Sequence, residues 1–317
     1  MKLPPTEKLV EASEKSLWIK VITATPVIMA VLSTLLAGLS SSEMSSSQYY
    51  RSIAAQDQSK AGDQWAFFQA KKIRGSTSGT AAEMLVDQGN ADPSFSPALL
   101  TGVTGAPASL SEMLTDPKTQ QALKLLSDES LPPLGTSFIA DDQLQKAYNA
   151  LSTGDEKSLD PHIFERITET TVREAIRHAE EQAQAVSDTF NGPLKTLAKL
   201  KSALIKMASS SDPQWRRILA TFSAAQQRFD AARQAREAQA NQVTAYLYEV
   251  EVRRASVQSD RHRVRSRYFF FGMLGAQTAV TIATIAIAAR EKNTLWSLAA
   301  GIGALAMAYA GYVFLFT

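Results

Sequence analysis

Histidine and carboxylate side chains are the residues of this chain that would most readily support catalysis or metal binding. His178 and Glu181 stand three residues apart, a spacing that places both on one helical face and would suit a metal ion. Their charged neighbours favour a solvated helix face instead, and His162 and His262 are distant in sequence. The chain has no HExxH, phosphate-binding loop, GxGxxG or GxSxG motif. We therefore predict no enzyme activity, cofactor or metal.

The amino-acid composition excludes further classes of protein function. The chain has 317 residues, of which 45% are hydrophobic, and a formal net charge of +2, which argues against a nucleic-acid binder. Cysteine is absent, which excludes disulfides, thiol catalysis and cysteine zinc sites. Glu249 and Glu251 with Arg253 and Arg254 are expected to form surface ion pairs. No small-molecule substrate is evident.

Three apolar segments are long enough to cross a membrane, which takes roughly 20 residues. The predicted order is an N-terminal tail (1–17), transmembrane helices 18–40 and 268–289, a basic turn (290–294) and transmembrane helix 295–317. Pro26 is expected to kink the first helix. The alternative for that segment is a cleaved signal peptide, but its apolar stretch exceeds the usual length of about 7–15 residues.

A basic collar precedes the second span. It consists of Arg261, Arg263, Arg265 and Arg267. We expect it to contact anionic lipid head groups, at about 1 kcal/mol per basic residue near the surface. The collar favours a cytoplasmic middle region, whereas the basic turn 290–294 and the serine-rich stretch after the first span favour the opposite orientation.

The spans carry no internal charged residue, although transporters and proton relays usually need one. Gln277 is a polar position inside the second span. The third span has a stripe of small residues at spacings of three and four: Gly301, Ala304, Ala308 and Gly311. Such a stripe is typical of close helix packing, which is the role we predict for it and for Gln277. A polar-lined conduit is the alternative.

Residues 160–267 are predicted to form antiparallel coiled-coil helices. The seam on the returning helix consists of Trp215, Phe222, Phe229, Val243, Val250, Val257 and Val264, with Arg236 as a polar occupant. Asp160-Pro161 and Asp212-Pro213 predict helix starts, and Asn191-Gly192-Pro193 predicts a break or bend. No Gly or Pro occurs from 214 to 271, so one helix should run from the seam into the membrane. The seams are rich in alanine and bury little area, which favours additional helices, either from residues 48–74 or from neighbouring subunits.

Between the first span and the coil, the sequence predicts two further segments. A juxtamembrane helix (41–74) begins in the serine-rich stretch, a soft helix start or flexible collar, and is expected to end at Gly75. Residues 75–159 are rich in Gly, Pro and Ser and predict an irregular insert with short helices. Disorder is the alternative, but large apolar residues such as Leu99 and Leu126 argue against it.

The most distinctive motif is DQWAFFQAKKIR at 63–74. Its notable residues are Asp63, Gln64, Trp65, Phe68, Gln69 and Lys72. We expect Trp65 and Phe68 to pack against the long helix, with the motif serving as a packing face near the membrane. A ligand or ion site at Asp63, Gln64 and Gln69 is the alternative.

The motif resembles the DQWAYYQAKxIK signature of the bacterial DUF4337 family. The layout is also similar, with an N-terminal span, a coiled-coil middle and a final pair of spans around a short basic turn. The resemblance covers the spans, the motif and the long helix, and leaves out residues 75–159. Because the family has no known function, the resemblance implies an architecture in the bacterial inner membrane and no activity.

The predicted fold class is all-α, with three transmembrane helices, a long extramembrane helical hairpin and an irregular helical insert. The predicted function is a non-enzymatic, homo-oligomeric scaffold or organiser at the membrane. One alternative is an oligomeric channel or pore. The other is a coiled-coil protein that transmits a signal, for which the sequence shows no output domain.

Overall fold

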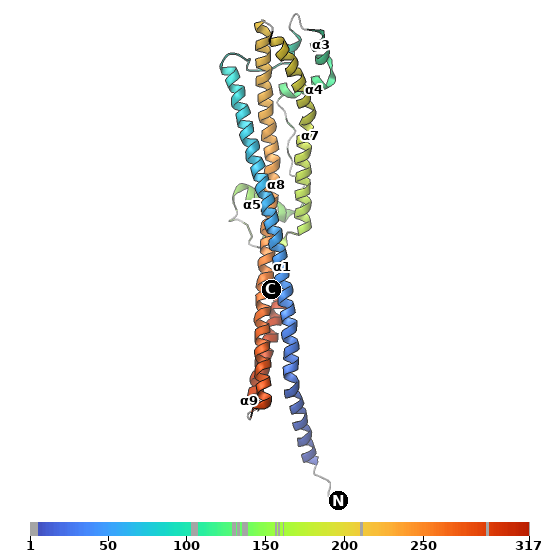
Figure 1. Cartoon of the computed structure of the whole chain (residues 1–317), viewed down its shortest axis with the longest axis vertical. Coiled ribbons are helices and arrows are strands. Elements are labelled where there is room, and N and C mark those ends of the chain that lie inside the picture. The colour runs from blue at the N-terminus through green and yellow to red at the C-terminus, as the bar shows by residue number, and fades with distance from the viewer. Residues whose placement is uncertain are drawn as a thin grey trace. The chain divides into compact units, whose positions relative to one another are not determined.

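The computed structural model describes residues 6–102, 107–128, 131, 134, 139–155, 157, 159–160, 162–209, 212–289 and 292–316. Within them every regular element is a helix, which confirms the all-α fold class. The long helices are α1 (Thr6–Asp87), α7 (Glu169–Ala208), α8 (Pro213–Ala288) and α9 (Lys292–Phe316) (Figure 1). The short helices are α2 (Ala98–Thr101), α3 (Ala108–Thr115), α4 (Pro117–Asp128), α5 (Asp142–Thr153) and α6 (Ile163–Arg166).

Two compact units make up the fold. Unit 1 comprises Met1–Ala54 and Arg254–Thr317, and unit 2 comprises Ala55–Arg253. Helices α1 and α8 contribute residues to both units. The predicted continuous helix from the seam into the second span is therefore present, as α8. The predicted tail and basic turn lie partly outside the described residues, since 1–5, 290 and 291 are not among them.

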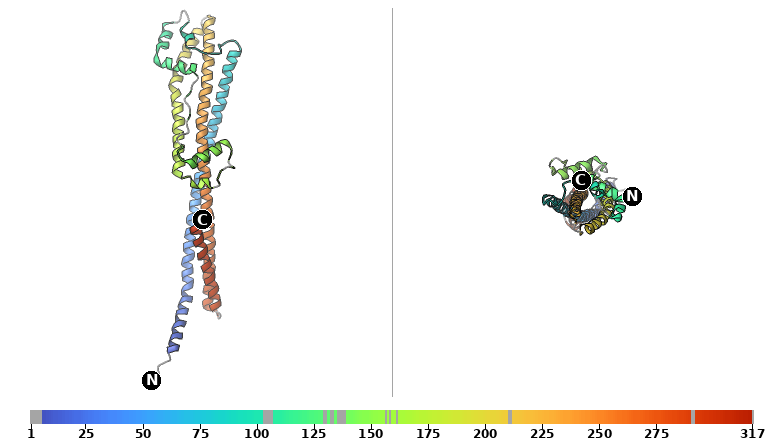
Figure 2. Two further views of the ribbon diagram at one scale, coloured as in Figure 1. Left: turned by 180° about the vertical axis from the view of Figure 1, so that it is seen from behind. Right: turned by 90° about the horizontal axis from the view of Figure 1, so that it is seen from above.

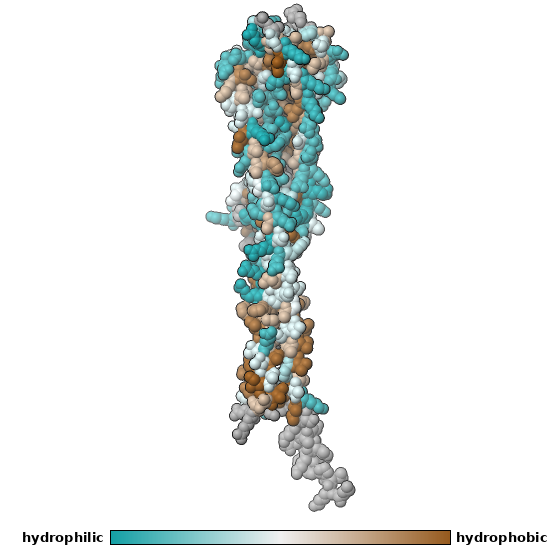
Figure 3. All heavy atoms as spheres, viewed as in Figure 1, coloured by the Kyte–Doolittle hydropathy of each residue, from teal (hydrophilic) through white to brown (hydrophobic). Residues whose placement is uncertain are grey.

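Unit 1 contains the predicted membrane spans. Helices α1, α8 and α9 each include a window long and apolar enough to cross a membrane. Figure 3 shows hydrophobic residues gathered over this part of the molecule. Pro26 lies inside α1, which continues on both sides of it. Three membrane-spanning helices are thus confirmed by length and composition.

The three spans pack together through small residues and a few large ones. The buried cluster consists of Leu36, Phe269, Ala276, Ala310 and Val313. A Cβ added to Gly272 would lie 3.3 Å from a methyl group of Leu36, so α1 approaches α8 closely there. The indole N–H of Trp296 in α9 donates to Thr25 Oγ1 in α1 at 2.9 Å. Thr25 in turn donates to its own helix, at Val21 O, so this buried polar group is satisfied.

The serine-rich stretch after the first span is the middle of α1, not a helix start or a flexible collar. Ser40 and Ser266 exchange hydrogen bonds with each other's backbone carbonyls, at 2.9 and 2.8 Å. Seven residues along each helix, Ser259 donates to the carbonyl of Ser47 at 2.9 Å. Serines suit this interface because they let helices approach closely and still satisfy their hydroxyls.

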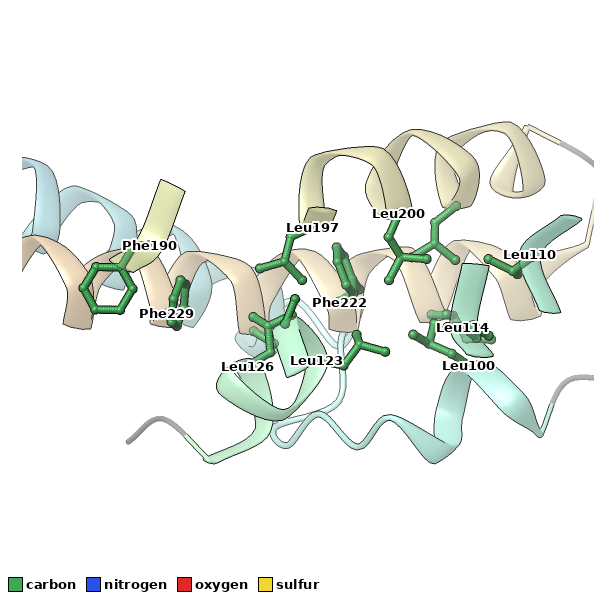
Figure 4. Packing of buried hydrophobic residues seen from close by; sticks show 14 of the residues in the cluster. Leu100, Leu110, Leu114, Leu123, Leu126, Phe190, Leu197, Leu200, Phe222 and Phe229 are labelled. Atoms are coloured by element: carbon green, nitrogen blue, oxygen red, sulfur yellow. The ribbon is translucent and has the colours of Figure 1, made fainter. Parts of the chain in front are cut away.

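Unit 2 is built on α1, α7 and α8, which lie side by side, with α7 and α8 antiparallel (Figures 1 and 2). One core lies where α7 ends and α8 begins. There Phe190, Leu197 and Leu200 of α7 meet Phe222 and Phe229 of α8 (Figure 4). A second core joins α5 and the start of α7 to α8 around Leu247 and Val250. The predicted helical hairpin is therefore observed, with α1 as its third helix.

The juxtamembrane helix does not end at Gly75, because α1 continues to Asp87. A Cβ added at Gly75 would lie 3.2 Å from Ala231 O and 3.3 Å from Gln234 Cβ of α8. Gly79, one turn further, lies against the Cβ of Ala231, and Ala82 is fully buried. The Gly- and Ser-rich sequence thus permits close helix packing, and that packing outweighs the weak helix propensity of these residues.

The rest of the predicted insert packs against unit 2. Helices α2, α3 and α4 contribute Leu100, Leu110, Leu114, Leu123 and Leu126 to the core shared with α7 and α8 (Figure 4). The short helices predicted for the insert are therefore present, and Asp116 separates α3 from α4. Asp141 caps α5 by accepting the backbone N–H of Leu144 at 2.7 Å.

The helix expected from Asp160 is divided. Asp160 accepts the backbone N–H of His162 at 2.9 Å and a guanidinium N–H of Arg166 at 2.7 Å. The backbone hydrogen bond from His162, followed by the positive charge of Arg166, holds the pKa of Asp160 below its ordinary range. Only the short α6 follows, and α7 then begins after Thr168, which accepts the backbone N–H of Thr171. Helix α7 continues through Pro193, so the predicted interruption there is not a helix end.

Candidate functional site

The DQWAFFQAKKIR motif lies on α1 within unit 2, against α8. The indole N–H of Trp65 donates to Glu249 Oε1 at 2.7 Å. The same indole meets the rings of Tyr246 and Phe68 edge to face, at centroid distances of 5.0 and 5.5 Å. Such edge contacts are favourable for aromatic pairs. Lys72 places its ammonium 5.8 Å from the centroid of the Phe68 ring.

A polar cavity of about 350 Å³ opens beside the motif. Its walls come from the three long helices of unit 2. They are Gln64, Phe67 and Lys71 of α1, Glu180, Ala183, Gln184 and Ser187 of α7, and Glu237, Asn241 and Thr244 of α8. Lys71 pairs with the buried carboxylate of Glu237, which Arg233 also contacts at 2.9 Å. Gln64 lines the cavity, whereas Asp63 and Gln69 are exposed, so the structure does not gather the three residues of the alternative ion site.

A buried ion network lies two turns before the motif. Asp57 (1% exposed) accepts two hydrogen bonds from the guanidinium of Arg173, at 3.1 and 2.8 Å. The same guanidinium lies 3.6 Å from Glu251, which is fully buried. Glu251 is therefore buried and not on the surface as expected, and Arg254 is buried as well. The network ties α1, α7 and α8 together through charges that would be costly to bury unpaired.

Tyr248 extends this network. Its hydroxyl donates to Glu180 Oε1 at 2.7 Å, and the ammonium of Lys60 lies 5.5 Å from its ring centroid. Burial, followed by the hydrogen bond to Glu180, raises the pKa of Tyr248 well above its ordinary value of 10.0. The neutral phenol is therefore the form that holds α7 to α8.

The predicted seam of α8 is partly buried as expected. Trp215, Phe222, Phe229 and Val250 are buried, Val243, Val257 and Arg236 are half-buried, and Val264 is 44% exposed. Val264 differs because α8 presents another face, that of Ser259 and Ser266, to α1 in unit 1. The heptad of large residues thus does not continue to the membrane.

Unit 1 places the predicted membrane residues on its surface. Gly301, Ala304, Ala308 and Gly311 are exposed, so this stripe does not pack within the chain. The packed face of α9 consists instead of Ala299, Gly303, Ala306, Ala310 and Val313. This face packs closely because Gly303 has no side chain, and Met29 of α1 occupies the space that a Cβ would need there. Gln277 is also exposed, halfway along the second span.

The basic collar and the histidines are placed as follows. Arg261, Arg263 and Arg267 are exposed, and Arg265 is half-buried. His262 is half-buried, with Nδ1 2.6 Å from Glu43 and its ring stacked on Tyr50 at 5.5 Å. His178 and Glu181 are 3.4 Å apart and exposed. Among the described residues no three side chains of metal-binding type gather around one point.

Sequence reasoning missed the small-residue heptad that joins α1 to α8. On α1 its buried or half-buried members are Ser33, Ser40, Ser47, Ala54, Ala61, Gly75 and Ala82. On α8 its members include Ala224, Ala231, Ala238, Ala245, Ser259 and Ser266. The spacing of seven or its multiples was visible in the sequence, but small residues give little hydrophobic signal.

The fold and these contacts define a helical protein with three membrane-spanning segments and a tightly packed extramembrane bundle. Residues 18–119 match the model of a family described as a domain of unknown function, DUF4337. No curated protein and no solved structure matches the chain. The resemblance seen in the motif is confirmed, but its extent differs from expectation. The match includes the first span, the motif and part of the expected insert, up to residue 119. It does not include α8 or α9, which carry the second and third spans.

Proposed function

We propose that this chain is a non-enzymatic, self-associating scaffold of the bacterial inner membrane. The observation that carries the proposal is the continuity of α1 and α8, each of which bears a membrane span and a wall of the bundle in one uninterrupted helix. Buried ion pairs and small-residue packing hold these helices, as a rigid organising element requires.

Self-association is supported by the position of Gln277. Its carboxamide is exposed on the second span, nine residues from the predicted start at Tyr268, or about 14 Å along the helix axis. Thr281 and Thr284 share this face, but their hydroxyls already donate to the carbonyls of Gln277 and Val280. An amide in hydrocarbon is stabilised when it bonds to another helix, and Gln277 of a second copy would supply that bond.

The mass of the full chain in mild detergent tests this proposal. Light scattering should give two or more copies for the natural sequence and mostly monomer for Gln277→Leu. Gln277→Asn keeps an amide and should keep the association. A monomeric natural chain would contradict self-association, and so would a Gln277→Leu variant that associates as before.

The exposed polar face of α8 also supports a second candidate, an oligomeric pore. Gln277, Thr278, Thr281 and Thr284 would line a path if several copies arranged this face inward. Ion flux into liposomes that contain the purified oligomer separates the two functions. The scaffold predicts no flux above that of empty liposomes, and a flux abolished by Gln277→Leu would favour the pore.

The proposed orientation places unit 2 in the cytoplasm, because the collar of arginines adjoins the membrane on that side. Lys199 is exposed on α7 and the chain has no cysteine, so Lys199→Cys supplies a single reporter. In intact cells with a permeable outer membrane, an impermeant maleimide should label this cysteine only after the inner membrane is opened. Labelling before opening would show the opposite orientation.

A further inference from the structure

An apolar groove lies on unit 1 between α8 and α9. It has a volume of about 490 Å³ and is lined by Phe271, Gly272, Gly275, Ile302, Leu305, Ala306, Ala308 and Tyr309. Its floor is narrow and flat because Gly272 and Gly275 have no side chains, and a Cβ on Gly275 would lie 3.3 Å from that of Ala306. Leu305 is 72% exposed and forms part of its rim. The volume is in the range of ligand pockets, roughly 300–1,000 Å³.

The collar arginines stand directly before this groove along α8. Arg267 precedes Phe271 by four residues and Arg265 precedes Gly272 by seven, so each shares a helical face with a groove-lining residue. From Arg267 to Gly275 the helix rises about 12 Å, which spans the head-group region and the first part of an acyl chain. The charged and apolar parts therefore follow the order of a phospholipid.

Arg265 provides an independent sign of an anion. Its Nε is buried and has no hydrogen-bond partner among the described residues. A buried guanidinium N–H without an acceptor is unfavourable, and a phosphate oxygen is the acceptor that arginine binds best. Tyr268 and Tyr309, whose ring centroids are 5.6 Å apart, stand at the same end of the groove, as interfacial aromatics do.

We propose that this groove binds one acyl chain of an anionic phospholipid whose phosphate lies between Arg265 and Arg267. The unpaired Nε of Arg265 favours the lipid over a second copy of the chain, because a phosphate supplies an acceptor whereas the arginines of a second collar supply only donors. Basic pockets beside transmembrane helices are a common form of anionic lipid site. The proposal requires that α8 and α9 cross the membrane, but it does not depend on the scaffold function or on self-association through Gln277.

Native mass spectrometry of the full chain in mild detergent tests the proposal. Phosphatidylglycerol and phosphatidylcholine with the same acyl chains are titrated separately. The first should bind more tightly, and Arg265→Gln and Arg267→Gln should each weaken it about fivefold. Arg51→Gln removes the same charge from an exposed position of α1 outside the collar and should have little effect. Equal binding of the two lipids, or equal effects of all three variants, would overturn the proposal.

The acyl part has its own variant and control. Ala308→Trp fills the groove and should weaken phosphatidylglycerol binding, whereas Ala304→Trp, exposed on the same helix but outside the groove lining, should not. Glycerol phosphate, which has no acyl chain, should bind far more weakly than the lipid. Undiminished lipid binding to Ala308→Trp would overturn the acyl assignment. A lipid-free dimer that Ala308→Trp dissociates would show that a second copy fills the groove.

Discussion

Ser47 of α1 and Ser259 of α8 face each other with their hydroxyl oxygens 3.1 Å apart, and both side chains are buried. They lie one heptad from the equivalent pair, Ser40 and Ser266. In unit 2, Gly75 faces Ala231 on the same two helices. Small side chains at these positions let the helix backbones approach closely, which large seam residues would prevent.

Replacement of Ser47 tests this close approach. Ser47→Ala should cost about 1 kcal/mol or less, because Ser259 keeps its bond to the backbone carbonyl. Ser47→Leu should lower the free energy of unfolding by about 2–3 kcal/mol through overpacking. Ser45 is exposed, so Ser45→Leu is the matched control and should change stability by about 0.5 kcal/mol at most. Helical circular dichroism during unfolding measures all three, and equal effects of the two leucines would contradict the assignment.

Two glycines of α1 should respond in opposite directions to alanine. Gly62 has open space around its Cβ position, so Gly62→Ala should stabilise the helix by about 0.5–1 kcal/mol. At Gly75 a Cβ would meet a backbone carbonyl of α8, which cannot move without the helix. Gly75→Ala should therefore be less stable than Gly62→Ala by at least about 1 kcal/mol. Thermal unfolding measures the difference, and a Gly75→Ala chain as stable as Gly62→Ala would show that the helices are not in close contact.

Replacing the arginine of the ion network alone should destabilise the chain more than replacing the arginine together with one of its carboxylate partners. Arg173→Met leaves the buried carboxylates of Asp57 and Glu251 without their shared guanidinium and should cost about 3 kcal/mol. Adding Asp57→Asn removes a buried charge that has lost its hydrogen-bonded arginine and keeps only Lys60, at 3.6 Å, so it should restore part of the loss. Denaturant unfolding of the single and double variants measures the coupling. Strictly additive losses would mean that the two side chains do not interact.

Tyr248 should confer a specific alkaline instability. Because its folded pKa is raised, the folded chain binds this proton more tightly than the unfolded chain above pH 10. The contribution is fully present below the ordinary tyrosine pKa and is lost as pH rises toward the folded pKa. Tyr248→Phe lacks the titrating group. Between pH 9 and pH 11 its free energy of unfolding should therefore fall less than that of the natural chain, by an amount that corresponds to the uptake of about one proton. Parallel curves for the two proteins over this range would contradict the buried phenol.

Large apolar residues made much of the fold predictable. The three spans, the continuity of α8 and the burial of Phe222 and Phe229 follow from long apolar runs and regular spacing. The end of α1 was not predictable in this way, since residues such as Gly75 have low helix propensity and their burial depends on a partner 156 residues away. On α8, Phe222 and Ala224 belong to two different faces. The heptad of large residues that includes Phe222 gives a strong hydrophobic signal, and the heptad of small residues that includes Ala224 gives a weak one.

The candidate site was predictable as a packing face but not in its contacts. Trp65 and Phe68 share a helical face in the sequence, and both pack there. The pairing of Trp65 with Glu249 spans 184 residues, and nothing local distinguishes Glu249 from an exposed carboxylate. Likewise, only the fold shows that Glu251 is buried, or that the small-residue stripe with Gly301 faces outward.

Cysteine crosslinking at Gln277 tests the central claim, self-association through the second span, most directly. The natural chain has no cysteine, so Gln277→Cys and Leu305→Cys each introduce one thiol, on the polar face of α8 and on the lipid groove respectively. Oxidation in native membranes should give a covalent dimer at position 277 and little at position 305. No dimer at 277, or equal dimer at both positions, would contradict the account.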